Sequence, residues 1–173
     1  MLSTVPALSR PDLLAAPVAA ALAGWAYADQ VGVAEIDPAL SDTAAFCQRY
    51  GVLLAAAANC VLVVGKRGGE LRWAACLVLA VHRADVNGVV RRHLDVRKVS
   101  FAATDDATAQ TAMEYGGITP IGLPPDWPIL VDRQVAEAGD VVIGSGVRRS
   151  KLVLPGDRLV ALAGAVLLDL SQP

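Results

Sequence analysis

A pair of apolar segments in the middle of the chain constrains the fold more than any other feature. The segments are residues 59–65 (NCVLVVG) and 71–81 (LRWAACLVLAV), and the connection between them is KRGGE. Paired glycines at this point are typical of a β-hairpin, with residues 66–69 in the turn. Neither segment alternates apolar and polar residues, so neither strand has a face suited to water. The sequence therefore predicts a hairpin that is covered on both sides.

Length and composition favour one domain built around this hairpin. The chain has 173 residues, of which 54% are hydrophobic and 18% charged, and it contains no internal repeat or long linker. These values suit one compact domain with a sizeable core, whereas two domains would be cramped.

The charge of the chain neither requires nor excludes a nucleic-acid partner. The net charge is −2, so contact with a nucleic acid would need a local basic patch. One such patch consists of Arg91, Arg92, Arg97 and Lys98, around a predicted helix over residues 84–95. A solvated helix face is the simplest interpretation of these four charges.

Helices and strands interleave irregularly on both sides of the hairpin. Apolar spacing, caps and turn residues predict helices over residues 11–24, 41–51, 84–95, 104–112, 133–138 and 156–163, and strands over 31–37, 98–101, 128–132, 140–146, 151–155 and 165–170. This order lacks the regular βαβα repeat of a doubly wound sheet. The predicted fold class is therefore mixed α/β, with a partly barrel-like sheet surrounded by helices.

Three residues are predicted to bound helices. Ser41 suits the N-cap of the helix over 41–51, and Gly51 suits its C-terminal end. Asp85 suits the cap of the helix over 84–95, whose apolar residues would form one buried stripe. That stripe consists of Val86, Val89, Val90 and Leu94.

The N-terminal part of the chain is expected to be a helical segment, residues 1–29, packed on a domain of residues 30–173. Its apolar stretch, residues 13–25, is shorter than the roughly 20 residues that a membrane span needs, and Pro17 interrupts it. A signal peptide is disfavoured because Arg10 is followed at once by a Pro-Asp pair typical of a helix start. We expect a cytoplasmic protein without membrane contact.

The cysteines and histidines give no sign of a metal or redox site. Cys47, Cys60 and Cys76 lie in apolar sequence without a CxxC pair, so free buried thiols in a reducing compartment are expected. His82 and His93 have no sequence context that ties them to a nucleophile or a metal. A cysteine hydrolase that pairs Cys60 with His82 is a weakly supported alternative, because a buried thiol resists ionisation.

A glycine and proline loop, MEYGGITPIGLPPDWP, is the first candidate binding element. Gly116 and Gly117 precede Ile118, Thr119 and Pro120. Proline fixes φ and glycine opens conformations that other residues avoid, so the loop should have a fixed shape. Free backbone N–H groups in such a loop suit an ester carbonyl or an oxyanion. Local sequence alone favours a plainer alternative, a tight turn that needs positive φ.

The second candidate element is the turn GSGVRRSK, residues 144–151, which follows an apolar strand. Ser145 and Gly146 stand near Arg148 and Lys151, and glycines at a strand end with adjacent cations suit a phosphate or a sugar. The GxxxxGK[ST] spacing of a P-loop is absent. A solvated basic turn is an equal alternative.

Taken in order, the motifs resemble one family. NCVLVV, AACLVLAVHRADV, VRKVSF, GGITPIGLP, ILVD, VIGSGVRRSKLVL and LVALAGAV together look like the YbaK and prolyl-tRNA synthetase-associated editing domain, over residues 30–168. The resemblance implies a mixed sheet curled toward a barrel, and a deacylase that hydrolyses mischarged tRNA such as alanyl- or cysteinyl-tRNA(Pro). No cofactor is implied. In that family the loop matching Gly116–Pro120 holds the aminoacyl ester, and a ribose hydroxyl of the tRNA helps to activate water.

The chain departs from this family at one position. Family members open the first hairpin strand with a lysine, whereas this chain has Asn59, or Ala58 in a register shifted by one, and neither supplies a positive charge. We expect Lys151 to supply that charge from the opposite wall. The predicted catalytic residues are Asn59, Gly116, Gly117 and Lys151, and the predicted substrate-binding residues are Gly116, Gly117, Ile118, Thr119, Pro120, Ser145, Gly146 and Arg148.

Two functional hypotheses follow from these observations. The first is a trans-editing deacylase for mischarged tRNA carrying a small amino acid, which the intact glycine loop favours. The second is a non-catalytic module of the same fold that binds an aminoacyl group, a nucleotide or tRNA, which Asn59 favours. The expected partners are mischarged tRNA, a synthetase or an elongation factor and, for so apolar a chain, a second copy of the chain.

Overall fold

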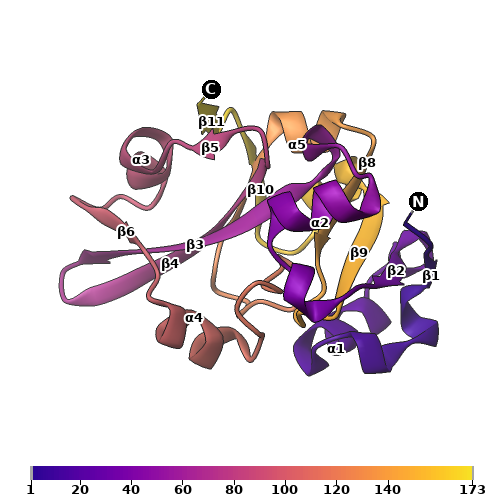
Figure 1. The fold of residues 1–173 in the computed structure, drawn as a ribbon. Coiled ribbons are helices and arrows are strands. Elements are labelled where there is room, and N and C mark those ends of the chain that lie inside the picture. The colour runs from indigo at the N-terminus through magenta and orange to yellow at the C-terminus, as the bar shows by residue number, and fades with distance from the viewer. Residues whose placement is uncertain (1, 173) are drawn as a thin grey trace.

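The computed structural model describes residues 2–172 and contains two main β-sheets (Figure 1). One sheet has five strands in the order β10 (Ala165–Leu168), β7 (Ile129–Asp132), β4 (Glu70–Leu79), β3 (Ala58–Arg67) and β6 (Val99–Phe101). Strand β7 runs parallel to both β4 and β10, whereas β3 is antiparallel to β4 and β6. The sheet is therefore mixed.

The second sheet is antiparallel and has four strands. Their order is β1 (Val5–Pro6), β2 (Gly32–Glu35), β9 (Ser150–Pro155) and β8 (Asp140–Gly144). A single bridge between Ala57 and Val142 links this sheet to the first one. A short pair, β5 (Arg83–Ala84) with β11 (Ser171–Gln172), forms a separate two-stranded sheet. The predicted mixed α/β class is confirmed, and the two sheets meet without closing into a barrel.

Short helices surround the sheets. They are α1 (Ala16–Ala23), α2 (Thr43–Tyr50), α3 (Arg91–His93), α4 (Thr104–Thr111) and α5 (Arg133–Glu137). Two of the expected helices are not continuous α-helices. Residues Gly156–Ala161 form a 3₁₀ helix, and the helix expected over 84–95 is divided into a π-helical turn, Val86–Val90, followed by α3.

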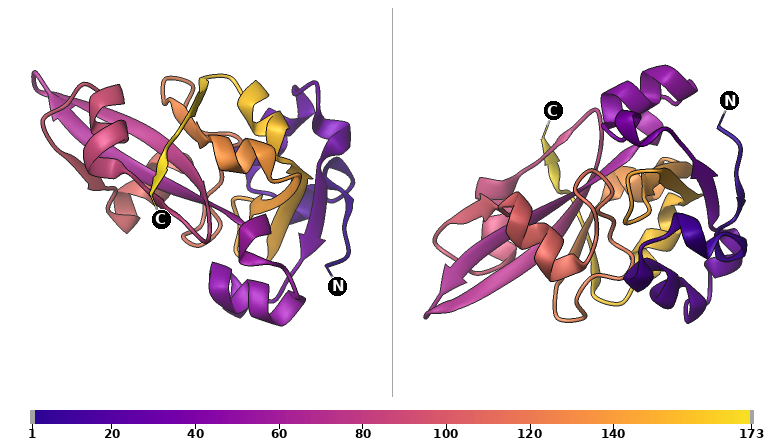
Figure 2. Two further views of the ribbon diagram at one scale, coloured as in Figure 1. Left: turned by 90° about the horizontal axis from the view of Figure 1, so that it is seen from above. Right: turned by 60° about the horizontal axis from the view of Figure 1, so that its bottom comes forward.

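The central hairpin is longer and more exposed at its tip than the sequence predicts. Strands β3 and β4 pair over ten residues each, up to Arg67 opposite Glu70. The turn is therefore only Gly68 and Gly69, both with positive φ, as a two-residue hairpin turn requires. The inner half of β4 is buried, but Leu71 is 61% exposed because the tip projects beyond the body of the molecule (Figure 2).

The helix caps agree with the sequence in two cases out of three. Asp85 accepts hydrogen bonds from the first turn of its helix, and Gly51 ends α2 with φ of 69°, both as predicted. The predicted N-cap Ser41 is wrong. Asp42 is the cap, because its carboxylate accepts hydrogen bonds from the N–H groups of Ala44 and Ala45.

The N-terminal segment contributes to the main hydrophobic core. Leu13, Val18 and Leu22 are buried there together with apolar residues of β8 and β9. Helix α1 begins at Ala16, later than predicted, and a 3₁₀ turn precedes it. No helix within residues 2–172 combines the length and the apolar character needed to cross a membrane.

Candidate functional site

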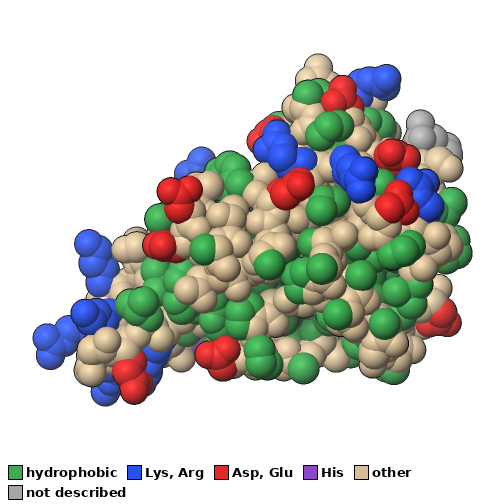
Figure 3. Space-filling model, turned by 90° about the horizontal axis from the view of Figure 1, so that it is seen from below, with side chains coloured by type: hydrophobic (Ala, Val, Ile, Leu, Met, Phe, Trp, Pro, Cys, Tyr) green, Lys and Arg blue, Asp and Glu red, His purple; other side chains and the backbone are tan. Residues whose placement is uncertain are grey.

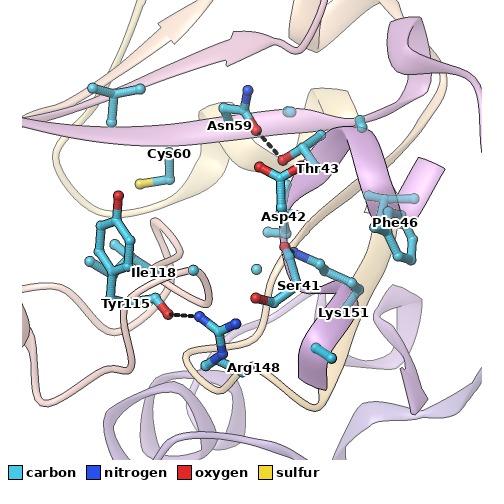
Figure 4. A pocket seen from close by; sticks show the side chains of 18 residues that line it. Ser41, Asp42, Thr43, Phe46, Asn59, Cys60, Tyr115, Ile118, Arg148 and Lys151 are labelled. Carbon is cyan, nitrogen blue, oxygen red and sulfur yellow. Dashed lines mark hydrogen bonds between the residues drawn. The ribbon is translucent and has the colours of Figure 1, made fainter. Parts of the chain in front are cut away.

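A cavity of about 380 Å³ lies beside the bridge between the two sheets (Figure 4). Its lining comes from the start of α2, the start of β3, the loop after α4, the end of β8 and the beginning of β9. These segments are far apart in the sequence. The cavity therefore exists only because the two sheets are packed together.

Five of the predicted site residues line this cavity. They are Asn59, Gly116, Ile118, Arg148 and Lys151. The glycine loop and the basic turn, which were separate candidates in the sequence, thus face one space. Asn59 and Lys151 line the cavity from different sheets, Asn59 from β3 and Lys151 from β9.

The other five predicted residues lie behind the lining. Thr119 and Ser145 are fully buried, and Pro120 and Gly146 are buried as well. Gly117 forms the turn itself, since its N–H donates to the Glu114 carbonyl and its carbonyl accepts from the Gly146 N–H at 2.7 Å. Direct substrate contact by these five residues stays a prediction. The hydrogen bonds of Gly117, Ser145 and Gly146 join the glycine loop to the basic turn and fix the turn itself.

The two paired glycines are needed for different reasons. Gly116 has φ of 86°, and a Cβ there would lie 3.0 Å from Ser41 Oγ and 3.1 Å from Arg148 Nη1. A Cβ on Gly117 would instead lie 2.6 Å from the Val147 carbonyl oxygen. Gly116 thus keeps the cavity floor open, whereas Gly117 permits close backbone packing behind it.

Lys151 places a buried ammonium group in the cavity. The side chain is only 6% exposed, its Nζ donates to the Ser41 carbonyl oxygen at 2.9 Å, and it lies 5.5 Å from the centre of the Phe46 ring. Burial lowers the pKa of this ammonium group below its usual range, and the nearby Cys47 and Asp42 oppose that shift. Within residues 2–172 the ammonium has no carboxylate ion pair, so its charge remains available to a ligand.

Asn59 is held in one orientation by the start of α2. Its Oδ1 accepts a hydrogen bond from Thr43 Oγ1 at 2.7 Å, as the dashed line in Figure 4 shows. The amide orientation is assigned from this bond. The Nδ2 group therefore keeps two N–H donors, which are neutral and weaker than an ammonium group.

Arg148 ties two loops together at the floor of the cavity. Its guanidinium donates to the Tyr115 carbonyl at 3.2 Å and to the Pro38 carbonyl at 3.1 Å, and its backbone N–H donates to the Glu114 carboxylate at 2.6 Å. The glycine loop is thereby fixed to the segment that precedes α2.

One side of the site is not predicted by the sequence. Ser41, Asp42, Thr43, Phe46 and Tyr115 also line the cavity. The letters SDT did signal a helix start, but nothing in the sequence shows that this helix begins beside the glycine loop. In this protein, the residue that caps α2 therefore also lines the site.

Cys60 lies in the cavity apart from His82, the base that a cysteine hydrolase would pair with it. Cys60 lines the cavity, but burial raises the pKa of its thiol, and His82 is not among the lining residues. A protonated thiol without a neighbouring histidine is a poor nucleophile. Within residues 2–172, no three His, Cys, Asp or Glu side chains cluster closely enough to hold a metal ion.

Comparison with known families gives a match over most of the chain. A family model described as the aminoacyl-tRNA editing domain matches residues 37–162. This range includes every residue of the cavity discussed above. No curated protein matches the sequence.

Solved structures share the fold at low sequence identity. A candidate trans-editing enzyme for prolyl tRNA synthetase has a TM-score of 0.77 and 22% identity, with 92% of this chain and 97% of that chain covered. The hypothetical protein APE2540 has a TM-score of 0.72 and 22% identity, with 81% of this chain and 90% of that chain covered. A candidate signal transduction protein from Marinobacter aquaeolei VT8 has a TM-score of 0.58 and 19% identity, with 91% of this chain and 30% of that chain covered.

Proposed function

The chain belongs to the aminoacyl-tRNA editing domain family, and from that premise we propose that it is a trans-editing deacylase. It would hydrolyse the ester that joins a wrongly attached small amino acid to the terminal ribose of a tRNA. One observation carries the proposal. A single cavity combines the Gly116–Ile118 loop, the Asn59 amide and the buried Lys151 ammonium group.

The proposed reaction is attack of water on the ester carbonyl carbon. The carbonyl oxygen gains negative charge, the bond to the ribose oxygen breaks, and the ribose hydroxyl leaves with a proton. A buried ammonium and preoriented N–H donors stabilise such an oxyanion because water does not screen them. We assign this role to Lys151 and Asn59. Water would be activated with the help of a ribose hydroxyl, so the chain need not supply a nucleophile.

We propose that Lys151 replaces the lysine expected at position 59. Its ammonium reaches the cavity from β9, while Asn59 reaches it from β3. Charge-assisted hydrogen bonds are about twice as strong as neutral ones, so the position of the one ammonium decides where the oxyanion is best stabilised. Asn59 would then orient the ester or the ribose.

The preference for a small amino acid is proposed from the apolar part of the lining. Phe46, Val61, Ile118 and Val142 face the cavity and together form an apolar surface that suits a short side chain. One methylene changes discrimination by only about 1–3 kcal/mol in an apolar pocket. The choice among alanine, cysteine, serine and proline therefore needs measurement.

The substrate also suggests where the protein acts and with which partners. We propose a cytoplasmic protein that receives charged tRNA from a synthetase or an elongation factor, and a homodimer as its assembly state.

A panel of charged tRNAs tests the function. Purified protein is incubated with alanyl-, cysteinyl-, seryl- and prolyl-tRNA, and release of the amino acid is measured. Release from at least one small amino acid ester, well above the uncatalysed rate, is expected. The second candidate, a binding module without activity, is favoured by the neutral Asn59. It would be supported if no ester is hydrolysed while tRNA still binds.

A further inference from the structure

Basic side chains are concentrated at one end of the molecule. Residues 65–72 and 91–98 hold seven of the fifteen Lys and Arg residues, but only two of the seventeen Asp and Glu residues. Because the net charge of the chain is −2, the remainder is strongly acidic. Figure 3 shows Lys and Arg side chains gathered at the narrow end of the molecule, which is the end where the β3–β4 hairpin projects.

Strand pairing brings cations from two segments together at this end. Strand β6 is antiparallel to β3, with Val99 opposite Gly65. One position further along each segment, Lys98 is therefore opposite Lys66. A Cβ on Gly65 would lie 3.0 Å from the Lys98 carbonyl oxygen, so glycine allows this close approach. Two exposed ammonium groups are thus placed on neighbouring backbone segments, Lys66 in β3 and Lys98 directly before β6.

Not all cations at this end are free. Arg67 pairs with the Asp95 carboxylate, and Arg72 donates to the Leu94 carbonyl at 2.8 Å, so these two arginines fix the 91–98 segment to the hairpin. The other five cations of these segments are exposed and form no ion pair within residues 2–172, and three of the five adjoin the pairing of β3 with β6. We call these three, Lys66, Arg97 and Lys98, the basic tip.

We infer that the basic tip binds the phosphate backbone of the duplex stem of the tRNA whose aminoacyl end enters the cavity. This inference rests on the proposed function. Strand β3 connects the two places, because Asn59 near its start lines the cavity and Arg67 ends it. Eight residues of strand separate them by about 26 Å. A ligand that reaches both must be long.

A nucleic-acid duplex fits these observations better than a compact anion does. An acidic chain repels a polyanion except where its cations gather, so the basic tip is the place where a long polyanion meets least repulsion. Proteins recognise RNA duplexes largely by shape and by phosphate contacts. Contacts at the tip would therefore add affinity for tRNA without selecting its sequence.

Charge reversal at the tip tests the inference. The variant Lys66→Glu/Lys98→Glu is compared with Arg49→Glu/Arg83→Glu, which makes the same charge change elsewhere, at exposed arginines that form no ion pair within residues 2–172. The Kd for uncharged tRNA is measured at several salt concentrations. We expect the tip variant to bind at least about 10-fold more weakly, and the slope of log Kd against log salt to fall by about 2. The control should stay within about two-fold of the wild type, and both variants should keep the wild-type Tm.

A second readout separates this inference from the proposed function. The aminoacyl ester of adenosine lacks a stem, so its kcat/KM should be equal in the tip variant and the wild type, whereas the KM for charged tRNA should rise at least about 10-fold. If the wild type hydrolyses neither substrate, the deacylase proposal fails. The binding of uncharged tRNA then still tests whether the basic tip binds the stem. An unchanged Kd and salt slope in the tip variant would overturn the inference. Tighter binding of the wild type to anionic phospholipid vesicles than to tRNA would also overturn it.

Discussion

Among single residues, Lys151 carries the largest share of the proposed chemistry, because it brings a buried positive charge into the cavity. Lys151→Met keeps most of the side-chain volume and removes the charge. We expect kcat/KM for charged tRNA to fall about 10²–10³-fold, the usual cost of losing one oxyanion donor. Asn59→Ala removes a neutral donor and should cost less, about 10-fold.

Deacylation assays with both variants decide between the two residues. Arg83→Met, at an exposed arginine, serves as the control and should leave the rate unchanged. If Lys151→Met remains active while Asn59→Ala is inactive, the proposed exchange of roles between the two positions is wrong.

The lowered pKa of Lys151 also predicts a dependence on pH. Burial disfavours the charged form, so the ammonium group loses its proton at a pH below the usual lysine range. Activity that needs the ammonium should therefore fall on the alkaline side, as pH rises through this lowered pKa. The residual activity of Lys151→Met should lack that decline. The comparison uses rates corrected for uncatalysed ester hydrolysis, and equal alkaline declines in both proteins would argue against the assignment.

Gly116 offers a test of the cavity floor with a closely matched control. Gly116 and Gly139 have φ of 86° and 77°, but only at Gly116 would a Cβ approach other atoms, those of Ser41 and Arg148. Both alanine variants should lose about 1–2 kcal/mol of stability from backbone strain. Only Gly116→Ala should also lose deacylation activity. Chemical denaturation measures the first effect, and full activity in Gly116→Ala would contradict the role of this loop.

At the scale of secondary structure, the start of α2 links stability to the site. Asp42 caps the helix, the preceding Ser41 carbonyl accepts from Lys151, and the following Thr43 holds Asn59. Asp42→Ala should therefore cost about 1 kcal/mol in the free energy of unfolding and also lower activity. Asp85→Ala removes a comparable cap outside the cavity and should lower stability alone.

The variant Asp42→Asn separates the capping of α2 from the negative charge of the Asp42 side chain. Asparagine caps helices about as well as aspartate, so this variant should keep both stability and the geometry of Ser41 and Thr43. Denaturation and deacylation are measured on the same preparations. Loss of activity in Asp42→Asn at full stability would show that the carboxylate acts on the substrate itself.

The sequence predicts the helices and strands better than it predicts which of them lie next to one another. The apolar runs around Gly68 and Gly69 specify the hairpin, because local turn chemistry and strand composition suffice for that. They do not show that the tip projects beyond the body, since this depends on how many strands flank it. Asp42 follows the same rule. Its capping signal is local, whereas its place beside Gly116 results from packing between the two sheets.

On the scale of the whole molecule, the site depends on how firmly the two sheets are held together. The cavity has contributions from both sheets and lies beside their bridge at Ala57 and Val142. Few backbone contacts join the two sheets, so buried side chains must hold the sheets together. The largest core cluster includes residues of the N-terminal segment as well as of both sheets. Packing of that segment should therefore influence a site that it does not touch.

Leu22 of α1 tests whether the N-terminal segment and the sheets unfold as one unit. Leu22 is fully buried in the main core, whereas Leu53 is 75% exposed. Leu22→Ala should lower the free energy of unfolding by about 2–5 kcal/mol, and Leu53→Ala should change it by less than about 0.5 kcal/mol. If the segment is an integral part of the fold, Leu22→Ala shifts a single transition that CD and tryptophan fluorescence report together. An early transition confined to the segment, with the main one unmoved, would instead support two units divided near residue 30, because the sheets would then keep the cavity intact without α1.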